Sequence, residues 1–229
     1  MIEIRLASVD SIIIYFGDEI SKDVSQKVKL AYLCIRGLNN KAFIEIIPSY
    51  TSILIKYDIF KYSFDSIKDY LNKNLSKMNE QLFENSSKLI NIDVYYSVDV
   101  GLDLQRIANN ANIKIDELIK IHSSKIYDVY AIGFLPGFAY LASVDEKIST
   151  PRLETPRKKI PKGSVAIANS QTAVYPCDSP GGWNIIGRTN FEFFDKSLEN
   201  LSPVNINSKI KFNPISKDEF IKQGGTIEF

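Results

Sequence analysis

The first 90 residues alternate between two hydrophobic periods. Between Ser63 and Ser76 the apolar positions recur at intervals of three and four, on one face of a helix: Phe64, Ile67, Tyr70, Leu71 and Leu75. A second amphipathic stretch runs from Asp23 to Arg36 and has the same helical character. The segment TSILIKY is short and rich in β-formers, as a strand is. This half of the chain is therefore predicted to be α+β.

A polar stretch separates this half from the rest. Residues 76–88 (SKMNEQLFENSSK) are polar and precede a new strand-like run, LINIDVYYSV. We therefore predict two domains, a small α+β domain at residues 1–90 and a second domain at residues 91–229. Asp103–Ile121 has a helical pattern that breaks near Asn109–Asn112 and then resumes.

From Tyr127 onward the pattern changes to short strands separated by turn-forming residues. The strand candidates are VYAIGF, SVAIA, AVYP, NIIGRT and KIKFNP, and no helical period here is long enough to compete with them. The tail KQGGTIEF is expected to be an edge strand or a loosely held end. The second domain is therefore predicted to be a closed or nearly closed β structure.

Composition excludes several classes of function. The 28 Lys and Arg residues nearly balance the 27 Asp and Glu, so the net charge of +1 provides no basic field for nucleic acid. The start has no basic leader pattern and no apolar run is long enough for a membrane span, so a cytoplasmic protein is expected. Cys34 and Cys177 lack zinc-site spacing, and a single histidine rules out a multi-histidine metal site. No metal site is predicted.

Candidate chemistry concentrates between Gly133 and Thr189. In GFLPGFAYL, Gly137 and Tyr140 fit a rigid loop that faces a ligand, although a tight turn with aromatic core anchors explains them equally well. In TPRLETPR the prolines restrain the loop that presents Arg152, and a guanidinium group suits a carboxylate or phosphate. A solvated loop with surface arginines is the competing interpretation. The following Arg157-Lys158-Lys159 run strengthens that alternative.

Two further segments continue this candidate site. Gln171 and Thr172 follow an apolar strand and are placed to hydrogen-bond a substrate amide, unless they only turn the chain. In SPGGWNIIGRT the glycine pair offers backbone N–H groups to an anion and an arginine follows, with a buried core tryptophan as the alternative. The candidates in this segment are Ser179, Gly181, Gly182, Trp183 and Arg188.

The single histidine and the absence of phosphate-loop motifs limit the chemistry. His122 lies near the end of a predicted helix, where packing or capping competes with a catalytic role. Neither GxxxxGK[ST] nor GxGxxG occurs in the sequence. If ATP is used, the nucleotide must bind by another arrangement or largely on a partner.

Taken together, GFLPGFAYL, TPRLETPRKKIPKGSVAIANSQTAVYP and SPGGWNIIGRT resemble the signature of the family of 5-oxoprolinase B subunits. This family is also called the kinase-A-inhibitor or allophanate hydrolase subunit 1 family, with carboxyltransferase subdomains C and D. The resemblance extends to GLDLQRIA, IHSSKIYDVY and IPSYTSILIKYD, and so covers nearly the whole chain. It implies an α+β N-terminal domain followed by a mainly-β, cyclophilin-like barrel. The family's Gly-Pro-Asp-Leu occurs here as Gly101-Leu102-Asp103-Leu104.

The resemblance also implies a function and partners. It implies a hydrolase subunit that, with partner subunits A and C, opens 5-oxo-L-proline to L-glutamate with ATP and magnesium, the nucleotide binding mainly at the partner interface. Alternative interpretations are an inhibitor of a sensor histidine kinase, or a carboxyltransferase component that acts on a urea-like amide. We expect catalytic roles for Arg152, Gln171, Arg188 and His122. Substrate or phosphate binding is expected for Gly137, Tyr140, Thr172, Ser179, Gly181, Gly182 and Trp183.

Overall fold

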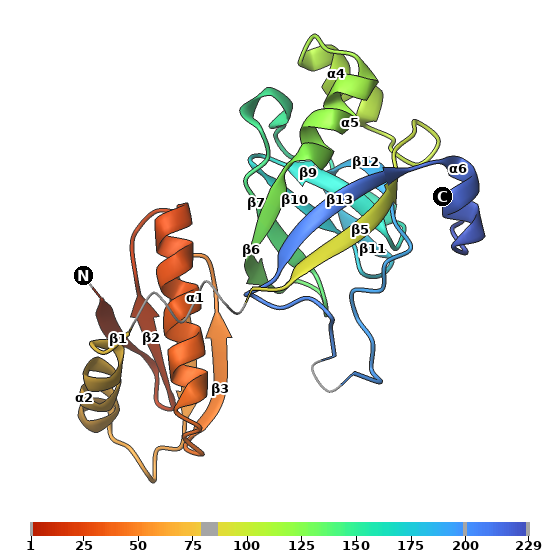
Figure 1. Ribbon diagram of the computed structural model, residues 1–229. Coiled ribbons are helices and arrows are strands. Elements are labelled where there is room, and N and C mark those ends of the chain that lie inside the picture. The colour runs from red at the N-terminus through yellow and green to blue at the C-terminus, as the bar shows by residue number, and fades with distance from the viewer. Residues whose placement is uncertain (1, 79–86, 199–200, 228–229) are drawn as a thin grey trace. The chain divides into compact units, whose positions relative to one another are not determined.

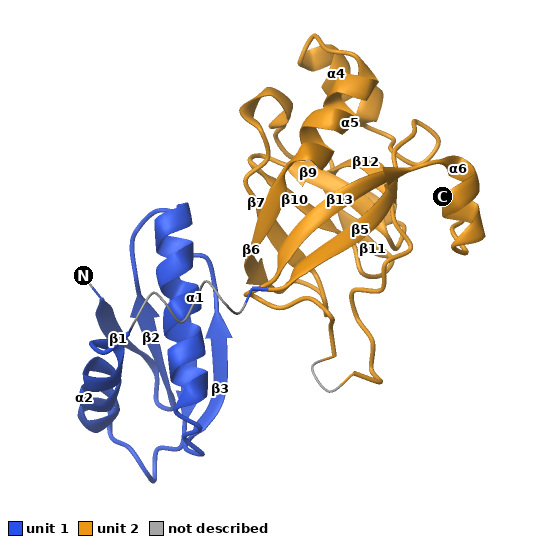
Figure 2. Cartoon of the chain, viewed as in Figure 1, with its two compact units in different colours: residues 1–87 blue, residues 88–229 orange. Residues whose placement is uncertain are grey.

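The chain divides into two compact units. The computed structural model describes residues 2–78, 87–198 and 201–227. Unit 1 comprises Met1–Ser87 and unit 2 comprises Lys88–Phe229, as Figure 2 shows. Each unit has its own hydrophobic core and is described separately.

Unit 1 is a four-stranded antiparallel sheet packed against two helices. The strands are β1 (Glu3–Ser8), β2 (Ser11–Tyr15), β3 (Phe43–Pro48) and β4 (Ser52–Tyr57), in the order β1-β2-β4-β3. The helices α1 (Lys22–Gly37) and α2 (Phe64–Leu75) begin after the serine caps Ser21 and Ser63. Fully buried isoleucines from the sheet meet helix residues in one core: Ile12, Ile14, Ile53, Ile55, Ile35 and Ile67. Both helices predicted from the apolar spacing are present.

Unit 2 is built around a closed seven-stranded barrel. Its strands are β5 (Leu89–Tyr95), β6 (Ile126–Ile132), β7 (Ala139–Ala142), β9 (Ser164–Ala168), β10 (Gln171–Val174), β12 (Asn184–Arg188) and β13 (Lys209–Ile215). They close in the order β10-β7-β6-β13-β5-β12-β9, with only the β5–β13 pair parallel among the described strands. A separate ladder joins β8 (Arg157–Ile160) to β11 (Ser179–Gly181). The prediction of an α+β region followed by a mainly-β barrel is confirmed.

Two helices cover one end of the barrel. Figure 1 shows α4 (Leu104–Asn110) and α5 (Ile115–Ser124) together there, and a short 3₁₀ turn, η1, spans Glu146–Ile148. The break predicted between the helices occurs at Asn112, which has a left-handed φ of 53°. Asparagine tolerates this conformation better than most residues.

One prediction for the C-terminal part is wrong. The helix α6 (Lys217–Lys222) lies where the sequence favoured strands alone, because Ser216 and Glu219 form a reciprocal capping box that starts a helix despite its shortness. The tail after α6 forms no strand over the described residues 223–227.

The barrel wall has two faces that carry different groups. Successive residues of a strand point to opposite sides, so Gln171 and Ala173 of β10 share one face and Thr172 shares the other with Val174. The β9–β10 register places Thr172 opposite Ile167 on the second face. The first face carries an aromatic cluster and the second packs against α5, so the sequence-predicted candidates are divided between two sides of one sheet.

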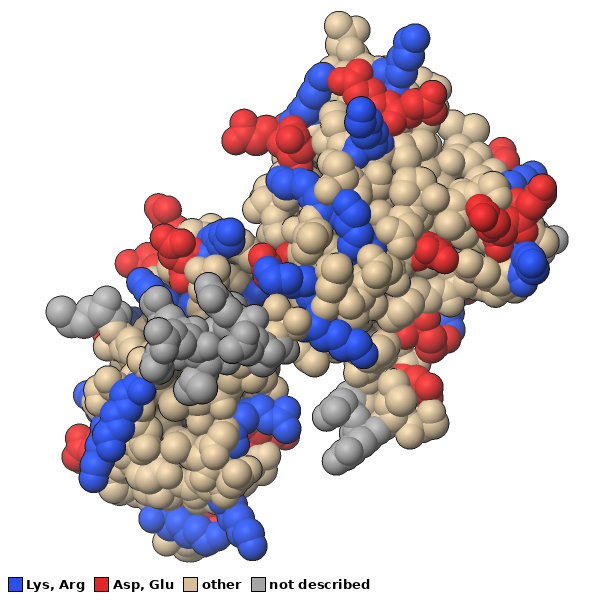
Figure 3. Space-filling model, viewed as in Figure 1, with Lys and Arg blue, Asp and Glu red and all other residues tan. Residues whose placement is uncertain are grey.

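The surface of unit 2 carries charges of both signs. On the face that Figure 3 shows, Asp and Glu side chains lie beside Lys and Arg side chains around the α4 and α5 end. This agrees with the near balance of charge in the sequence. Within the described residues, no helix has the length and apolar character needed to cross a bilayer.

Candidate functional site

An aromatic cluster lines the first face of the barrel wall. Phe138 lies at its centre, with ring centroids 4.9 Å from Tyr140, 5.3 Å from Tyr175 and 5.8 Å from Trp183. Tyr140 also lies 5.9 Å from Trp183. Beneath the rings, β9 and β10 contribute small side chains that leave room for them: Ala166, Ala168 and Ala173. Ile160 and Ile185 complete the cluster. The alternating alanines of β9 and β10 therefore form the floor of an aromatic-walled site.

Arg152 brings a positive charge to this aromatic face. Its guanidinium carbon lies 5.8 Å from the centre of the Trp183 ring, a distance at which a cation is attracted to the ring face. The side chain is exposed, and no hydrogen bond or ion pair engages it within the described residues. Because Trp183 itself is only 5% exposed, the indole positions the arginine while remaining part of the core. The donors of Arg152 are thus available to a ligand.

Two tyrosine hydroxyls stay protonated beside this charge. Burial raises the pKa of Tyr175 to about 12, against the opposing effects of a hydrogen bond from the Trp183 backbone and the charge of Arg152. Burial also raises the pKa of Tyr140, which Arg152 partly opposes. Both hydroxyls therefore serve as hydrogen-bond donors near neutral pH. Gln171 begins β10 on the same face and pairs with Ala168 and Ala142 across the ladders.

The glycine pair and Ser179 lie beside this cluster, against the chain's own atoms. A Cβ on Gly181 would stand 2.3 Å from the Tyr175 hydroxyl, so only glycine fits beneath it. The carbonyl of Gly182 accepts a 2.7 Å hydrogen bond from the backbone N–H of Leu153, which ties the pair to the Arg152 loop. Ser179 is buried on β11. These residues shape and anchor the site.

Gly137 lies where the chain approaches its own backbone closely. It has a left-handed φ of 82°, and a Cβ would stand 2.4 Å from the carbonyl oxygen of Phe193. Any side chain would therefore displace the neighbouring backbone. The position is explained by packing of the loop that precedes β7.

His122 and Thr172 lie together on the second face and are fully buried. The Thr172 hydroxyl donates to the carbonyl of Ala166 at 2.9 Å, so it accepts from Nε2 of His122 at 2.9 Å. Nδ1 of His122 then accepts from the Tyr96 hydroxyl at 2.7 Å. The ring also stacks on Phe212, with centroids 4.9 Å apart. His122 is thus a satisfied core histidine with no exposed surface, and we leave it and Thr172 out of the proposed site.

Burial of His122 predicts a stability that depends on pH. Desolvation lowers the pKa of His122 to about 3 in the folded protein. In the unfolded chain its pKa is 6.5, the ordinary value for histidine. The unfolded state therefore holds more protons between these values, and stability falls as pH drops through this window, by about 1.4 kcal/mol per unit. Urea unfolding followed by Trp183 fluorescence should show a loss of about 2 kcal/mol between pH values of about 6.5 and about 5.

The variant His122→Gln is the control for this titration, because glutamine keeps hydrogen-bonding capacity but binds no proton in this range. Its unfolding free energy should stay nearly flat over the same pH window. Parallel pH curves for the two proteins would contradict the assignment of a neutral buried imidazole.

Arg188 lies away from the aromatic face. It ends β12, whereas Trp183 precedes the first residue of that strand, so roughly 16 Å of extended chain separates them. Arg188 is 3% exposed, donates from Nη1 to the carbonyl of Thr226 at 2.9 Å, and has its pKa lowered by burial. The structure does not bring Arg152 and Arg188 together, and we leave Arg188 out of the proposed site.

A buried carboxylate outside the set of predicted residues organises the other side of the Arg152 loop. Asp103 accepts two hydrogen bonds from Arg157, at 2.8 and 3.0 Å, and one from Arg106 at 3.1 Å. The backbone N–H of Ile185 donates to it at 2.8 Å. Burial alone would raise the pKa of Asp103, but these hydrogen bonds outweigh it and lower the pKa. Asp103 therefore stays ionised and links α4, β8 and β12.

Asn184 completes this network. Its side-chain amide donates to the carbonyls of Pro151 at 2.8 Å and Ile167 at 2.9 Å, and its oxygen accepts a hydrogen bond from Arg106. Because the Pro151 carbonyl directly precedes Arg152, this bond fixes the start of the loop that carries Arg152. Asn184 is fully buried, so the network holds the loop from inside unit 2.

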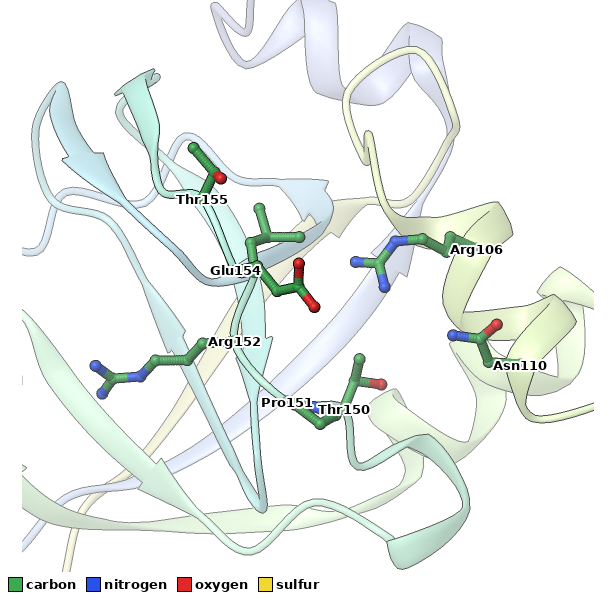
Figure 4. Close-up of a pocket in the computed structure, with 8 residues that line it drawn as sticks. Arg106, Asn110, Thr150, Pro151, Arg152, Glu154 and Thr155 are labelled. Carbon is green, nitrogen blue, oxygen red and sulfur yellow. The ribbon is translucent and has the colours of Figure 1, made fainter.

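The loop and α4 border an open pocket of about 450 Å³. Eight residues line it: Arg106, Asn110, Thr150, Pro151, Arg152, Leu153, Glu154 and Thr155. Figure 4 shows Arg106 and Glu154 directed into the space between the loop and α4, while the side chain of Arg152 extends away from Arg106 and Asn110. The loop therefore has two sides, one toward the aromatic cluster and one toward this pocket. Over the described ranges, no group of three or more His, Cys, Asp or Glu side chains could hold a metal ion.

Comparison with known proteins assigns the chain to a family. Residues 2–204 match the model of the carboxyltransferase domain, subdomain C and D. The chain belongs to this family. It is 33% identical over 220 residues to the B subunit of the 5-oxoprolinase of Bacillus subtilis (strain 168), covering 92% of this chain and 91% of that protein.

Solved structures of similar proteins share the fold of this chain. PH0987 of Pyrococcus horikoshii is 39% identical with a TM-score of 0.57, and the match covers 95% of this chain and 100% of PH0987. The urea carboxylase of Kluyveromyces lactis has a TM-score of 0.72 at 16% identity, over 96% of this chain and 22% of that protein. At this identity the likeness to urea carboxylase shows a shared fold.

Proposed function

We propose that this chain is the B-type component of a 5-oxoprolinase, which together with partner subunits A and C uses ATP to open 5-oxo-L-proline to L-glutamate. The observation that carries this proposal is the match to the B subunit of the Bacillus subtilis enzyme, which extends over nearly the full length of both proteins. The motif-bearing segments and the elements that hold them fall within this match. We place the reaction in the cytoplasm, where ATP is supplied.

The chemistry of lactam opening accounts for the residue types of the aromatic face. A lactam carbonyl is a poor electrophile, and transfer of the γ-phosphoryl group of ATP to its oxygen converts that oxygen into a leaving group. Water then adds to the carbon, and the ring C–N bond breaks with proton transfer to the nitrogen, which gives an acyl phosphate. A second water molecule hydrolyses this acyl phosphate to glutamate and inorganic phosphate. A fixed guanidinium stabilises the negative charge that develops on oxygen in these steps.

We propose that Arg152 supplies this charge, held by the Trp183 ring. The Tyr140 hydroxyl and the Gln171 amide lie on the same face and would orient the lactam by hydrogen bonds. Gly181 and Gly182 act through Tyr175 and Leu153, as their contacts indicate. In this proposal the reacting groups contact Arg152, Tyr140 and Gln171.

We further propose that the magnesium-bound nucleotide is held mainly by a partner subunit. The sequence lacks both common glycine-rich phosphate-binding motifs. Arg157 is engaged by Asp103 through both of its terminal nitrogens, and the Arg152 side chain extends away from Arg106. The contribution of this chain to phosphate binding is then the single guanidinium of Arg152.

The proposal is tested by omission from a reconstituted mixture. Release of glutamate from 5-oxo-L-proline and ATP should require this chain together with subunits A and C. A mixture that assembles fully and instead transfers a carboxyl group to an amide would favour the carboxyltransferase alternative.

A further inference from the structure

The pocket between α4 and the Arg152 loop carries two opposite charges that do not pair. Glu154 and Arg106 point into it from opposite sides, as Figure 4 shows. Within the described part of the chain, the ion pairs of Arg106 involve Asp103 alone, and Glu154 forms none. The aromatic face does not use this pocket, because the Arg152 side chain extends away from it. The pocket therefore offers a bound ligand one cation, Arg106, and one anion, Glu154.

Arg106 is held in position before any ligand arrives. Its Nη2 atom donates to Oδ1 of Asp103 at 3.1 Å and to Oδ1 of Asn184. These two acceptors are nearly fully buried and fix one end of the guanidinium fork. The rest of the group lines the pocket, and the side chain is 44% exposed. A preorganised fork with free donors suits a carboxylate, because little entropy is lost when it binds.

The charged groups that contact Asp103 leave the Arg106 side of the pocket positive. Asp103 contributes one negative charge and is shared by Arg106 and Arg157, so these three groups together carry one net positive charge. An anionic group that approaches Arg106 is therefore attracted by a net positive charge, because Asp103 neutralises only one of the two arginines.

Glu154 offers the complementary charge on the opposite side. It is exposed and lies in the loop whose start is fixed by the bond from Asn184 to the Pro151 carbonyl. A primary ammonium group is the compact cation that a single carboxylate binds well. Asn110 adds an amide group to the pocket wall.

We propose that this pocket binds a zwitterionic α-amino acid, with its carboxylate on Arg106 and its ammonium group on Glu154. The ligand class is argued from the pocket alone. The choice of L-glutamate as the probe rests on the proposed function, whose product it is. The lactam substrate 5-oxo-L-proline has the carboxylate but no ammonium charge, so the pocket discriminates between the two sides of that reaction.

The test is calorimetric titration of the full chain, without partner subunits, with L-glutamate, glutarate and 5-oxo-L-proline. Glutarate has the carbon chain and carboxylates of glutamate but lacks the ammonium group. We expect L-glutamate to bind about tenfold more tightly than either analogue, the factor given by one charge-assisted hydrogen bond. Glu154→Gln should remove this preference while leaving the affinity for glutarate unchanged. Glu146→Gln, an exposed glutamate on η1, should leave all three affinities unchanged.

Equal affinity for L-glutamate and glutarate would overturn the proposal, as would a preference that survives Glu154→Gln. In Arg152→Gln, which removes the guanidinium of the aromatic face, saturable binding of 5-oxo-L-proline as tight as that of L-glutamate would also overturn it, because the ammonium group would then contribute nothing. Absence of any binding heat and of any thermal shift with L-glutamate would overturn it too. These readouts need no turnover, so failure of the pocket assignment is distinguishable from failure of the oxoprolinase function.

Discussion

Asp103→Ala should lower the free energy of unfolding of unit 2 by about 3 kcal/mol, because it strips the partner from two arginines that α4 and β8 bring together. The side chain of Asp103 is only 4% exposed, and the Ile185 backbone N–H would also lose its acceptor. This loss of unfolding free energy is at the lower end of the range for a broken buried ion pair. Arg106 and Arg157 are partly exposed, so both regain some hydration when Asp103 is removed.

The measurement is urea unfolding followed by the fluorescence of the single tryptophan, which lies in unit 2 and so reports on that unit. Glu192→Ala is the matched control, because it breaks the 2.6 Å ion pair with Lys162 at the surface. We expect this control to lose less than about 1 kcal/mol. Equal losses in the two variants would show that the Asp103 network contributes no more than a surface pair.

Arg152→Gln should lower kcat/KM of the assembled complex for 5-oxo-L-proline by about 100-fold, the cost of removing one donor that stabilises a developing oxyanion. The arginine is exposed and its contact is to the Trp183 ring, so folding should be unaffected. The effect should appear mainly in kcat if the charge acts in the transition state, and in KM if it only binds the substrate carboxylate.

Lys158→Gln is the control for Arg152→Gln. Lys158 is an exposed cation six residues further along the chain, on β8, and its removal changes the local net charge by the same amount. Its kinetics should match the unmodified complex within about twofold, because an exposed charge away from the site contributes little. Equal losses for both substitutions would mean that Arg152 acts through the general field and has no specific contact.

The helices and barrel strands could be predicted from the sequence because they depend on local patterns. The apolar period at Phe64–Leu75 and the strand runs at Ser164–Ala168 and Asn184–Arg188 each match an element of the structure. The helix α6 could not be predicted in this way, since its six residues are too short to give a clear period and its start depends on a capping box. Hydrophobic periodicity therefore identifies the long helices and strands, whereas the short helix α6 depends on its side-chain cap.

The candidate site could be predicted in part. The segments that carry Tyr140, Gln171, Arg152 and Trp183 meet on one face of the barrel wall, because strand alternation and the β9–β10 register place them there. The same alternation sends Thr172 to the opposite face, one residue after Gln171. Gln171 and Thr172 are adjacent in the sequence, but the pleat of β10 places their side chains on opposite faces.

The Asp103 network could not be predicted because its members lie far apart in the chain. Arg157 opens a run of three basic residues that is typical of a solvated surface, yet it makes a two-point contact with Asp103. Asn184 directly follows the tryptophan, and nothing in that segment indicates its buried partners. The one local signal is the Gly-Leu-Asp-Leu stretch before α4, where an aspartate precedes a helix. Which arginines it binds is decided by the closed barrel.

These features connect the buried network to the proposed chemistry. Asn184 and Gly182 each hydrogen-bond the backbone of the Arg152 loop, and both belong to the segment that enters β12. The loop is therefore fixed on both sides of Arg152, which allows one side chain to face the aromatic cluster while Glu154 faces the pocket. Rigid presentation of a charge from such a loop is what stabilisation of a transition state requires.

The central claim is that this chain is an obligatory component of a 5-oxoprolinase, and the most direct measurement is the coupled release of ADP and glutamate from 5-oxo-L-proline and ATP. The complete mixture with subunits A and C should release both products in equal amounts, and the mixture that lacks this chain should release no glutamate. Undiminished glutamate release without this chain would contradict the account, as would an assembled complete mixture that shows no coupled turnover.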